Sequence, residues 1–307
     1  MKWPEQKKFA FTVVDDTDKA TVENVKPVYD LLAESGIKTT KTVWPIAPER
    51  EGRFGGMTCQ DEEYLEWLYT IRDAGFEIAF HGAADQTSRR EDTGRAIDAF
   101  HKFFGADQFL YCAHADQGES IYWGEYRIGG MRRKIYQLAT RLKRRNQFRG
   151  HLEGDPLFWG DLCRKHVSYV RNFTYREINT LGICSEMPYH DPSRPYVNYW
   201  FASSDGPNVR SFCDLISEEN QDLLEKSGGA CIAYTHFAND FLIDGKLDPE
   251  FVRLIKALSS RDGWFVPAST MLEHLRSQAG WRSDIDPKRL RRLEWKWLLG
   301  KLAHGTS

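Results

Sequence analysis

The stretch Lys8 to Asp18, KFAFTVVDDTD, decides the fold. An apolar, β-branched run of period two extends from Phe9 to Val14, and this pattern predicts a buried strand. The run stops at two adjacent carboxylates, Asp15 and Asp16. A strand of this kind at the start of an α/β chain places both acids on the carboxyl-end rim of a sheet, where such folds bind their ligands.

Two neighbouring carboxylates can divide a chemical task. Repulsion raises the pKa of one acid and leaves the other ionised, so one can bind a cation while its neighbour handles protons. The alternative is that Asp15 and Asp16 only cap the helix that begins near Ala20, although Thr17 or Asp18 could do this equally well. We expect a functional role because of the residues downstream.

The composition excludes some classes of protein. The chain has 307 residues, enough for one large α/β domain or two small ones, and its net charge of -2 argues against a dedicated nucleic-acid binder. The chain has ten tryptophans and thirteen tyrosines. Such rings often line carbohydrate sites, but they also fill large cores.

Cysteines and the amino-terminal segment bear on the compartment. Six cysteines are scattered without a C-x-x-C pair, which favours buried reduced thiols over disulfides or a zinc knot. The segment MKWPEQKKF runs into the first strand without an apolar signal region, and no window approaches eighteen apolar residues. We therefore expect a cytoplasmic protein, unless a leader has been removed.

Helix and strand patterns alternate along the first third of the chain. The expected helices are 21–35, 61–74 and 90–104, and the expected strands after the first are 37–44, 76–81 and 108–114. Alternation at this pitch indicates parallel strands joined by crossover helices, and hence a barrel or a doubly wound sheet.

The middle of the chain, residues 119–200, is expected to be an inserted, irregular region. Nine Lys or Arg residues lie between Arg127 and Arg149, and no acid lies between them, which predicts a helix with a basic face. That face is either solvated surface or a patch for an anionic substrate or an anionic membrane. From Tyr169 to Trp200, short strand-like pieces alternate with prolines and suggest a lid over the sheet.

Regular patterns return at Gly228 to His236, GGACIAYTH, which predicts a buried strand ending in His236. A helix over 249–259, a strand over 263–267 and a helix over 270–278 complete a single expected domain, residues 1–280. The remainder, 281–307, is expected to be a basic amphipathic helix and tail. Such a helix either makes peripheral membrane contact or, more commonly, packs against the domain or a second subunit.

Groups that bind metals or move protons follow four of the expected strands. These groups are the Asp15 and Asp16 pair, His81, His114 and His236. In a parallel barrel the carboxyl ends of all strands open on one rim, so the groups should converge there. One carboxylate with two imidazoles suits a catalytic divalent ion, with zinc expected first and cobalt, nickel or manganese as alternatives. Such a site hydrolyses an amide or an ester.

Four segments resemble the polysaccharide deacetylase superfamily, which carries the NodB homology domain. They are VVDDTD, GFEIAFH, CIAYTH and WFVPASTMLEHL, and the resemblance spans about Phe9 to Leu275. It implies a distorted (β/α) barrel with fewer than eight strands. By the same resemblance, Asp15 would be the catalytic base, Asp16 a metal ligand and His236 the general acid.

The sequence departs from the family pattern in two places. The family's second metal-binding histidine is replaced by Asp85, four residues after His81, so the third ligand would be Asp85 or, as we favour, His114. The arginine and proline motif of the fourth strand is also absent, and YCAHADQGESIYWG stands in its place. Within this segment we expect four substrate contacts, which are Gln117, Glu119, Tyr122 and Trp123. Tyr122 and Trp123 could equally be core residues.

Three functional hypotheses follow. The first is a metal-dependent hydrolase that removes an acyl group, such as acetyl, from an amino sugar or another saccharide, with a cell-surface polysaccharide precursor as the expected substrate. The second is a catalytically inactive barrel that binds carbohydrate. The third keeps the metal and changes the substrate to a non-sugar amide. All three exclude nucleic acid as the partner.

Overall fold

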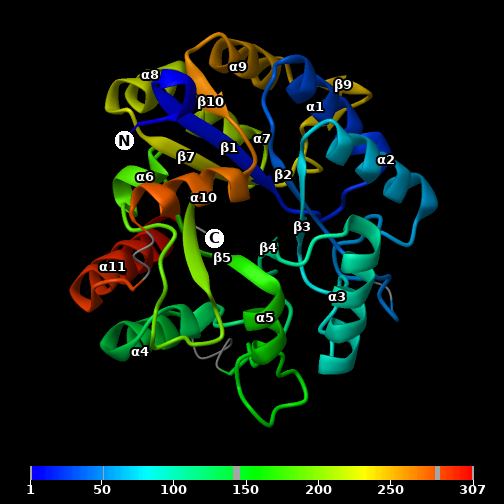
Figure 1. The fold of residues 1–307 in the computed structure, drawn as a ribbon, viewed down its shortest axis with the longest axis vertical. Helices are drawn as coiled ribbons and strands as arrows, with labels where there is room; N and C mark the ends of the chain where they lie inside the picture. Colours follow the sequence, from blue (N-terminus) through cyan, green and yellow to red (C-terminus); the bar gives the residue numbers. More distant parts are fainter. Residues whose placement is uncertain (1, 51, 141–145, 281–283, 306–307) are drawn as a thin grey trace.

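The computed structural model describes residues 2–50, 52–140, 146–280 and 284–305, and its centre is a closed barrel of parallel strands (Figure 1). Neighbouring strands follow the chain order from β1 to β7, and β1 also pairs with β7, from Ala10 opposite Ala230 to Asp15 opposite Thr235. This closes a seven-stranded ring, and an eighth parallel strand, β10, pairs with β1 outside it. The (β/α) barrel expected from the sequence is confirmed.

The barrel strands are short. Their bounds are β1 Phe9–Asp15, β2 Thr40–Val43, β3 Glu77–Phe80, β4 Phe109–Tyr111, β5 Val167–Tyr175, β6 Tyr199–Asp205 and β7 Ala230–Thr235, with β10 at Gly263–Phe265. A separate antiparallel hairpin consists of β8 Leu242–Ile243 and β9 Lys246–Leu247.

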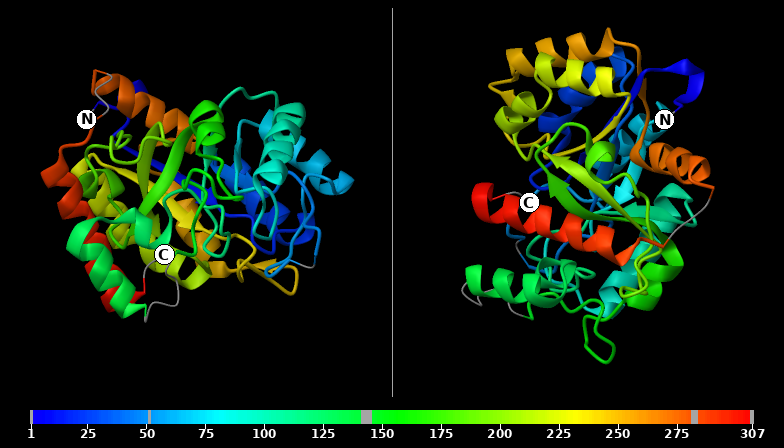
Figure 2. Two further views of the ribbon diagram at one scale, coloured as in Figure 1. Left: turned by 90° about the horizontal axis from the view of Figure 1, so that it is seen from below. Right: turned by 90° about the vertical axis from the view of Figure 1, so that its left-hand side faces the viewer.

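Helices surround the ring (Figures 1 and 2). They are α1 Val22–Glu34, α2 Glu62–Asp73, α3 Arg90–Phe104, α4 Gly130–Ala139, α5 Gly160–His166, α6 Thr180–Ile183, α7 Val209–Leu215, α8 Glu218–Ser227, α9 Pro249–Ser259, α10 Ala268–Gln278 and α11 Pro287–His304. Two short 3₁₀ turns are η1 Pro4–Gln6 and η2 Gly124–Arg127. None of the helices within the described ranges is long and apolar enough to cross a membrane.

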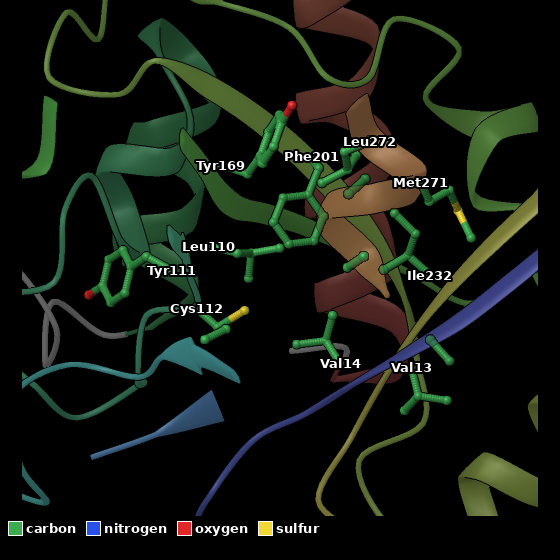
Figure 3. Packing of buried hydrophobic residues seen from close by; sticks show 14 of the residues in the cluster. Val13, Val14, Leu110, Tyr111, Cys112, Tyr169, Phe201, Ile232, Met271 and Leu272 are labelled. Carbon is green, nitrogen blue, oxygen red and sulfur yellow. The ribbon is translucent and has the colours of Figure 1, made fainter. Parts of the chain in front are cut away.

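Apolar side chains from the strands and the surrounding helices fill the core. Figure 3 shows Val13 and Val14 of β1 near Ile232 of β7, with Leu110 and Phe201 facing the same space. These side chains are fully buried. Burying each such side chain contributes about 1.5–3 kcal/mol relative to leaving it in water. The core therefore holds the strand ends rigidly around the mouth of the barrel.

The first third of the chain and its last elements match the sequence expectations. Helices α3 and α9 have the expected bounds, and the expected strands at 37–44, 76–81 and 108–114 contain β2, β3 and β4. The middle region differs. Its second half contains the barrel strand β5 and runs into β6, where we expected a lid. Prolines interrupt the segment between these strands, but the strands themselves belong to the ring.

The carboxyl-terminal helix packs against the barrel. Helix α11 contacts β5 and the basic helix of the middle region, α4, and the two helices lie side by side in both views of Figure 2. Leu293, Trp297 and Leu298 are buried, and the Trp297 ring lies 5.7 Å from both Phe173 and Tyr136. The last cations of the expected basic helix, 141–145, lie outside the described residues.

Candidate metal centre

The turn after β1 carries a third acid into the mouth of the barrel. Strand β1 ends at Asp15, and the next residue still pairs with β7, because the Asp16 N–H donates to the Thr235 carbonyl. The chain then turns, with the Ala20 N–H donating to the Thr17 carbonyl. Asp18 lies inside this turn and is buried.

Three histidines surround Asp18. The Nε2 atoms of His81 and His114 lie 3.5 Å and 3.4 Å from its Oδ1 atom. The Nε2 atom of His236 lies 3.0 Å from its Oδ2 atom. Each histidine follows the end of its strand, β3, β4 or β7. The structure therefore brings together the three histidines that the sequence singled out, around an acid that it treated only as a helix cap.

Asp18, His81 and His114 have the composition and spacing of a metal site, which we call the Asp18 cluster. One ligand atom from each lies within 4.8 Å of the others. Asp18 Oδ1 and both ring nitrogens of His81 are buried and lack hydrogen-bond partners. Buried polar atoms without partners are costly, and a cation held there would satisfy Asp18 Oδ1 and the His81 nitrogen that faces it, Nε2.

The charge state of Asp18 fits the same interpretation. Burial raises its pKa, but its interactions with His114, His236 and His81 outweigh burial and bring the pKa well below its ordinary value. The carboxylate is therefore ionised at neutral pH, as a metal ligand must be.

Asp16 lies beside the cluster and is held by an arginine. Arg171 of β5 donates from both terminal nitrogens to the two carboxylate oxygens, at 3.0 Å and 2.5 Å. Burial raises the pKa of Asp16, but the charges of Arg171 and His81 outweigh burial and lower it. Its Oδ1 atom lies 3.9 Å from His81 Nδ1. The sequence predicted Asp16 as a metal ligand; in the structure Asp18 lies closest to His81 and His114, and Asp16 is paired with Arg171.

The Asp15 carboxylate lies in a closed environment. Its carboxylate is fully buried and forms an ion pair with Lys41 Nζ at 2.9 Å. It also accepts hydrogen bonds from the Tyr29 hydroxyl at 3.1 Å and the Phe237 N–H at 2.8 Å. Burial raises its pKa despite these partners. The sequence-based role of catalytic base for Asp15 stays a prediction, and the contacts of its carboxylate are with Lys41, Tyr29 and Phe237.

His236 presents one ring nitrogen to the cluster. Its Nδ1 atom lies 3.0 Å from the Pro207 carbonyl, to which it donates, and this leaves Nε2 facing Asp18. Burial lowers its pKa, but the hydrogen bond and charge of Asp18 outweigh burial and raise it. The ring can therefore carry a proton at the mouth of the barrel.

Asp85 is engaged elsewhere. Its Oδ2 atom accepts the backbone N–H groups of Phe54 at 2.7 Å and Gly55 at 2.8 Å. Of the two alternatives for the third ligand, His114 lies in the cluster, and Asp85 binds the backbone of the loop at Phe54 and Gly55.

Two clefts lie near the ends of the barrel strands, and one of them is lined by a residue of the cluster. One, of about 850 Å³, is lined by His114, Gln117 and other polar side chains. Gly82 has a φ of +109°, and Gln117 packs closely over it. A Cβ atom on residue 82 would lie 2.3 Å from the Gln117 Oε1 atom. The other cleft, of about 1050 Å³, lies between the ends of β5 and β6 and helix α11, and includes Pro207, the partner of His236.

The other three expected substrate contacts are buried in the segment that follows. Burial raises the pKa of Glu119 to about 8. The Tyr122 ring lies 4.3 Å from the His151 ring, and the Arg127 guanidinium lies 3.2 Å from the centre of the Trp123 ring. Neither cleft is lined by these three residues.

Sequence reasoning did not single out Asp18 and Arg171 as site residues. Asp18 was visible as a third acid two positions after Asp16. Arg171 is a charged residue within the run VSYVRNFTY, and a charge inside a buried strand usually has a buried partner. That rule was the available signal for this residue.

Comparisons with known proteins give a likeness in structure. No protein-family model matches the chain, and no curated protein matches it in sequence. A putative polysaccharide deacetylase from Mycobacterium smegmatis matches with a TM-score of 0.51 and 15% identity, over 93% of this chain and 96% of that one. The Puue allantoinase matches with a TM-score of 0.51 and 13% identity, over 90% and 92%.

Both matches extend over nearly the whole of each chain, so they concern the complete barrel. At these identities they show the fold and leave the substrate open. The resemblance to the polysaccharide deacetylase superfamily seen in the sequence is therefore confirmed at the level of the fold: this chain has the divergent barrel that a polysaccharide deacetylase and an allantoinase share.

Proposed function

We propose that the chain is a metal-dependent hydrolase that removes an acyl group from a saccharide, with Asp18, His81 and His114 as the metal ligands. The observation that carries the proposal is the convergence of these three groups, with buried and unpartnered ligand atoms, beside two further proton-carrying groups. Two imidazoles and one carboxylate suit zinc first, and cobalt, nickel or manganese as alternatives. A bound ion would polarise the substrate carbonyl and lower the pKa of a bound water.

Asp16 is suited to accept a proton. Arg171 fixes the carboxylate with two hydrogen bonds, and the lowered pKa keeps it ionised at neutral pH. Its Oδ1 atom lies 3.9 Å from His81 Nδ1, so the carboxylate is next to a residue of the cluster, where a proton acceptor is needed. We therefore assign the general base to Asp16 in place of Asp15.

His236 is suited to give a proton to the departing group. The Pro207 carbonyl holds its Nδ1 atom, which orients Nε2 toward Asp18. Asp15 supports this orientation indirectly, because it accepts the N–H of Phe237, the next residue along the chain. A base on one side of the cluster and an acid on the other are the groups that hydrolysis of an amide or ester needs.

A saccharide substrate is supported by the fold shared with a polysaccharide deacetylase and by the polar lining of the cleft beside His114. The equal TM-score to an allantoinase favours a non-sugar amide as the second candidate.

The test combines metal analysis with a substrate panel. Protein purified without chelator should contain a transition ion, and Asp18→Asn should lower its metal affinity at least about 100-fold. The matched control is Asp85→Asn, which should retain the metal. A panel of acetylated sugars and cyclic amides then separates the two substrate classes. A wild-type protein without metal, or metal that Asp18→Asn leaves in place, would overturn the assignment; glycan binding without acid release would favour an inactive carbohydrate-binding barrel.

A further inference from the structure

Exposed apolar side chains gather on one part of the surface. The described residues include seven large apolar side chains that are at least 36% exposed, and five of them lie on the adjacent helices α4 and α11. We name this surface the α4/α11 face. Its apolar members are Met131, Leu138, Trp295, Leu299 and Leu302.

The helical spacing places these residues on continuous stripes. Trp295, Leu299 and Leu302 are four and three positions apart, which is one face of α11. Met131 and Leu138 are seven positions apart on α4. Where the two helices meet, the Arg132 guanidinium lies 5.8 Å from the centre of the Trp295 ring.

The charge of the same surface is positive. Three exposed cations, Lys134, Arg291 and Arg292, have no salt-bridge partner among the residues that the structure describes. The single acid on either helix is Glu294, which is buried and paired with Arg132 at 2.6 Å and Arg194 at 3.4 Å. The net charge of the whole chain is -2, so this positive charge is local.

We propose that the α4/α11 face docks the protein on an anionic lipid surface. Tryptophan and leucine side chains insert at the boundary of headgroups and acyl chains, while neighbouring cations contact anionic headgroups. Residues 295–302 of α11 supply the exposed tryptophan and leucines, and Arg291 and Arg292, nearer its amino terminus, supply two of the cations.

Charge favours this occupant over a second copy of the chain. A two-fold contact through the same face would bring Lys134, Arg291 and Arg292 toward their own counterparts, and like charges facing each other disfavour association. An anionic bilayer is complementary to both the apolar and the basic groups.

Docking would also orient the barrel. Leu299 and Gly300 line the cleft that contains Pro207, so this cleft opens beside the proposed contact. The docking proposal itself does not depend on the hydrolase assignment, because none of its residues belongs to the Asp18 cluster.

The test is co-sedimentation of the full chain with vesicles. Phosphatidylcholine vesicles should bind little protein, and vesicles in which about a third of the lipid is phosphatidylglycerol should bind it in a salt-sensitive manner. The double variant Arg291→Glu, Arg292→Glu should weaken this binding more than about 20-fold. Leu299→Glu should weaken it about tenfold.

The controls change matched residues elsewhere. Leu223→Glu on α8 replaces another exposed leucine, and Lys246→Glu on the β8–β9 hairpin reverses another exposed cation; both should bind like the wild type. Unchanged thermal unfolding of each variant confirms that it is folded. Failure of the wild type to bind anionic vesicles would overturn the proposal. So would equal loss in the controls, or a lipid-free dimer that Leu299→Glu dissociates.

Discussion

Asp15 and Asp16 are neighbours in the sequence but lie in different kinds of environment. Asp15 is sealed in the barrel, with Lys41, Tyr29 and Phe237 satisfying its carboxylate. Asp16 lies at the mouth, where Arg171 holds it beside His81. Both acids are almost completely buried. Burial alone therefore does not distinguish a structural charge from a functional one, and the distinction lies in which atoms remain open to a ligand.

The two environments also differ in how many of their buried polar atoms have hydrogen-bond or ion-pair partners. The Asp15 carboxylate has a cation and two hydrogen-bond donors as partners. In the Asp18 cluster, by contrast, three buried polar atoms have no hydrogen-bond partner. A ligand bound at the cluster would remove the cost of leaving such atoms unsatisfied. The predictions below test this comparison, beginning with the largest effect.

Among substitutions that leave the metal in place, replacing Asp16 should lower catalysis most. Asp16→Asn keeps the size of the side chain and removes the proton acceptor, so kcat/KM should fall by about 10²–10⁴. Metal content should stay unchanged, because Asp16 is outside the cluster. Steady-state kinetics and metal analysis of the same preparation measure both quantities. If Asp16→Asn stays active while folded Asp15→Asn is inactive, the base is Asp15, as the sequence suggested.

Removing the partner of Asp15 should lower stability and leave the metal in place. Lys41→Met leaves a fully buried carboxylate without its cation, which should cost about 3–5 kcal/mol in the free energy of unfolding. Chemical denaturation measures this cost. Adding Asp15→Leu should recover part of it, because the unpaired charge is then removed. A Lys41→Met protein of normal stability that had lost its metal would contradict the comparison.

Periodicity predicted the regular elements well where one face of the element is apolar. Helix α9 shows this, since its buried residues Phe251, Leu254, Ile255 and Leu258 have helical spacing. It failed at β5. That strand carries Arg171 and Asn172 inside the protein because it lines the mouth, and its polar residues concealed the strand pattern. The residues that build the site thus obscured the strand that holds them.

The histidines of the site could be predicted, but its acid could not. His81 and His114 each follow a strand end, and parallel topology alone brings strand ends to one rim. The choice among Asp15, Asp16 and Asp18 depends on how the chain turns after β1. In the structure, Lys19 adopts a positive φ of 61° and its N–H donates to the Gly55 carbonyl. That contact comes from a distant loop and is not encoded in the local pattern.

Glu119 should make stability depend on pH. Burial raises its folded pKa to about 8 from an unfolded value near 4.5. Between these values the unfolded state releases its proton first and so binds fewer protons, and stability should fall as pH rises from about 4.5 to 8. The total loss from this group is about 5 kcal/mol at most. Glu119→Gln should flatten the profile, and exposed Glu34→Gln should not; urea unfolding at several pH values measures the difference.

The smallest effect is expected at an exposed ion pair of the same chemical type as the Asp15 pair. Lys26 and Asp30 form an i,i+4 pair on α1, with N–O distance 2.6 Å and about half of each side chain exposed. Water screens this pair, so Lys26→Ala should change the free energy of unfolding by no more than about 0.5 kcal/mol. The same denaturation assay that detects Lys41→Met serves here. The Lys26–Asp30 pair has a shorter N–O distance than the Lys41–Asp15 pair and differs from it mainly in exposure. If Lys26→Ala lost as much stability as Lys41→Met, burial would not be the reason that the Asp15 pair is important.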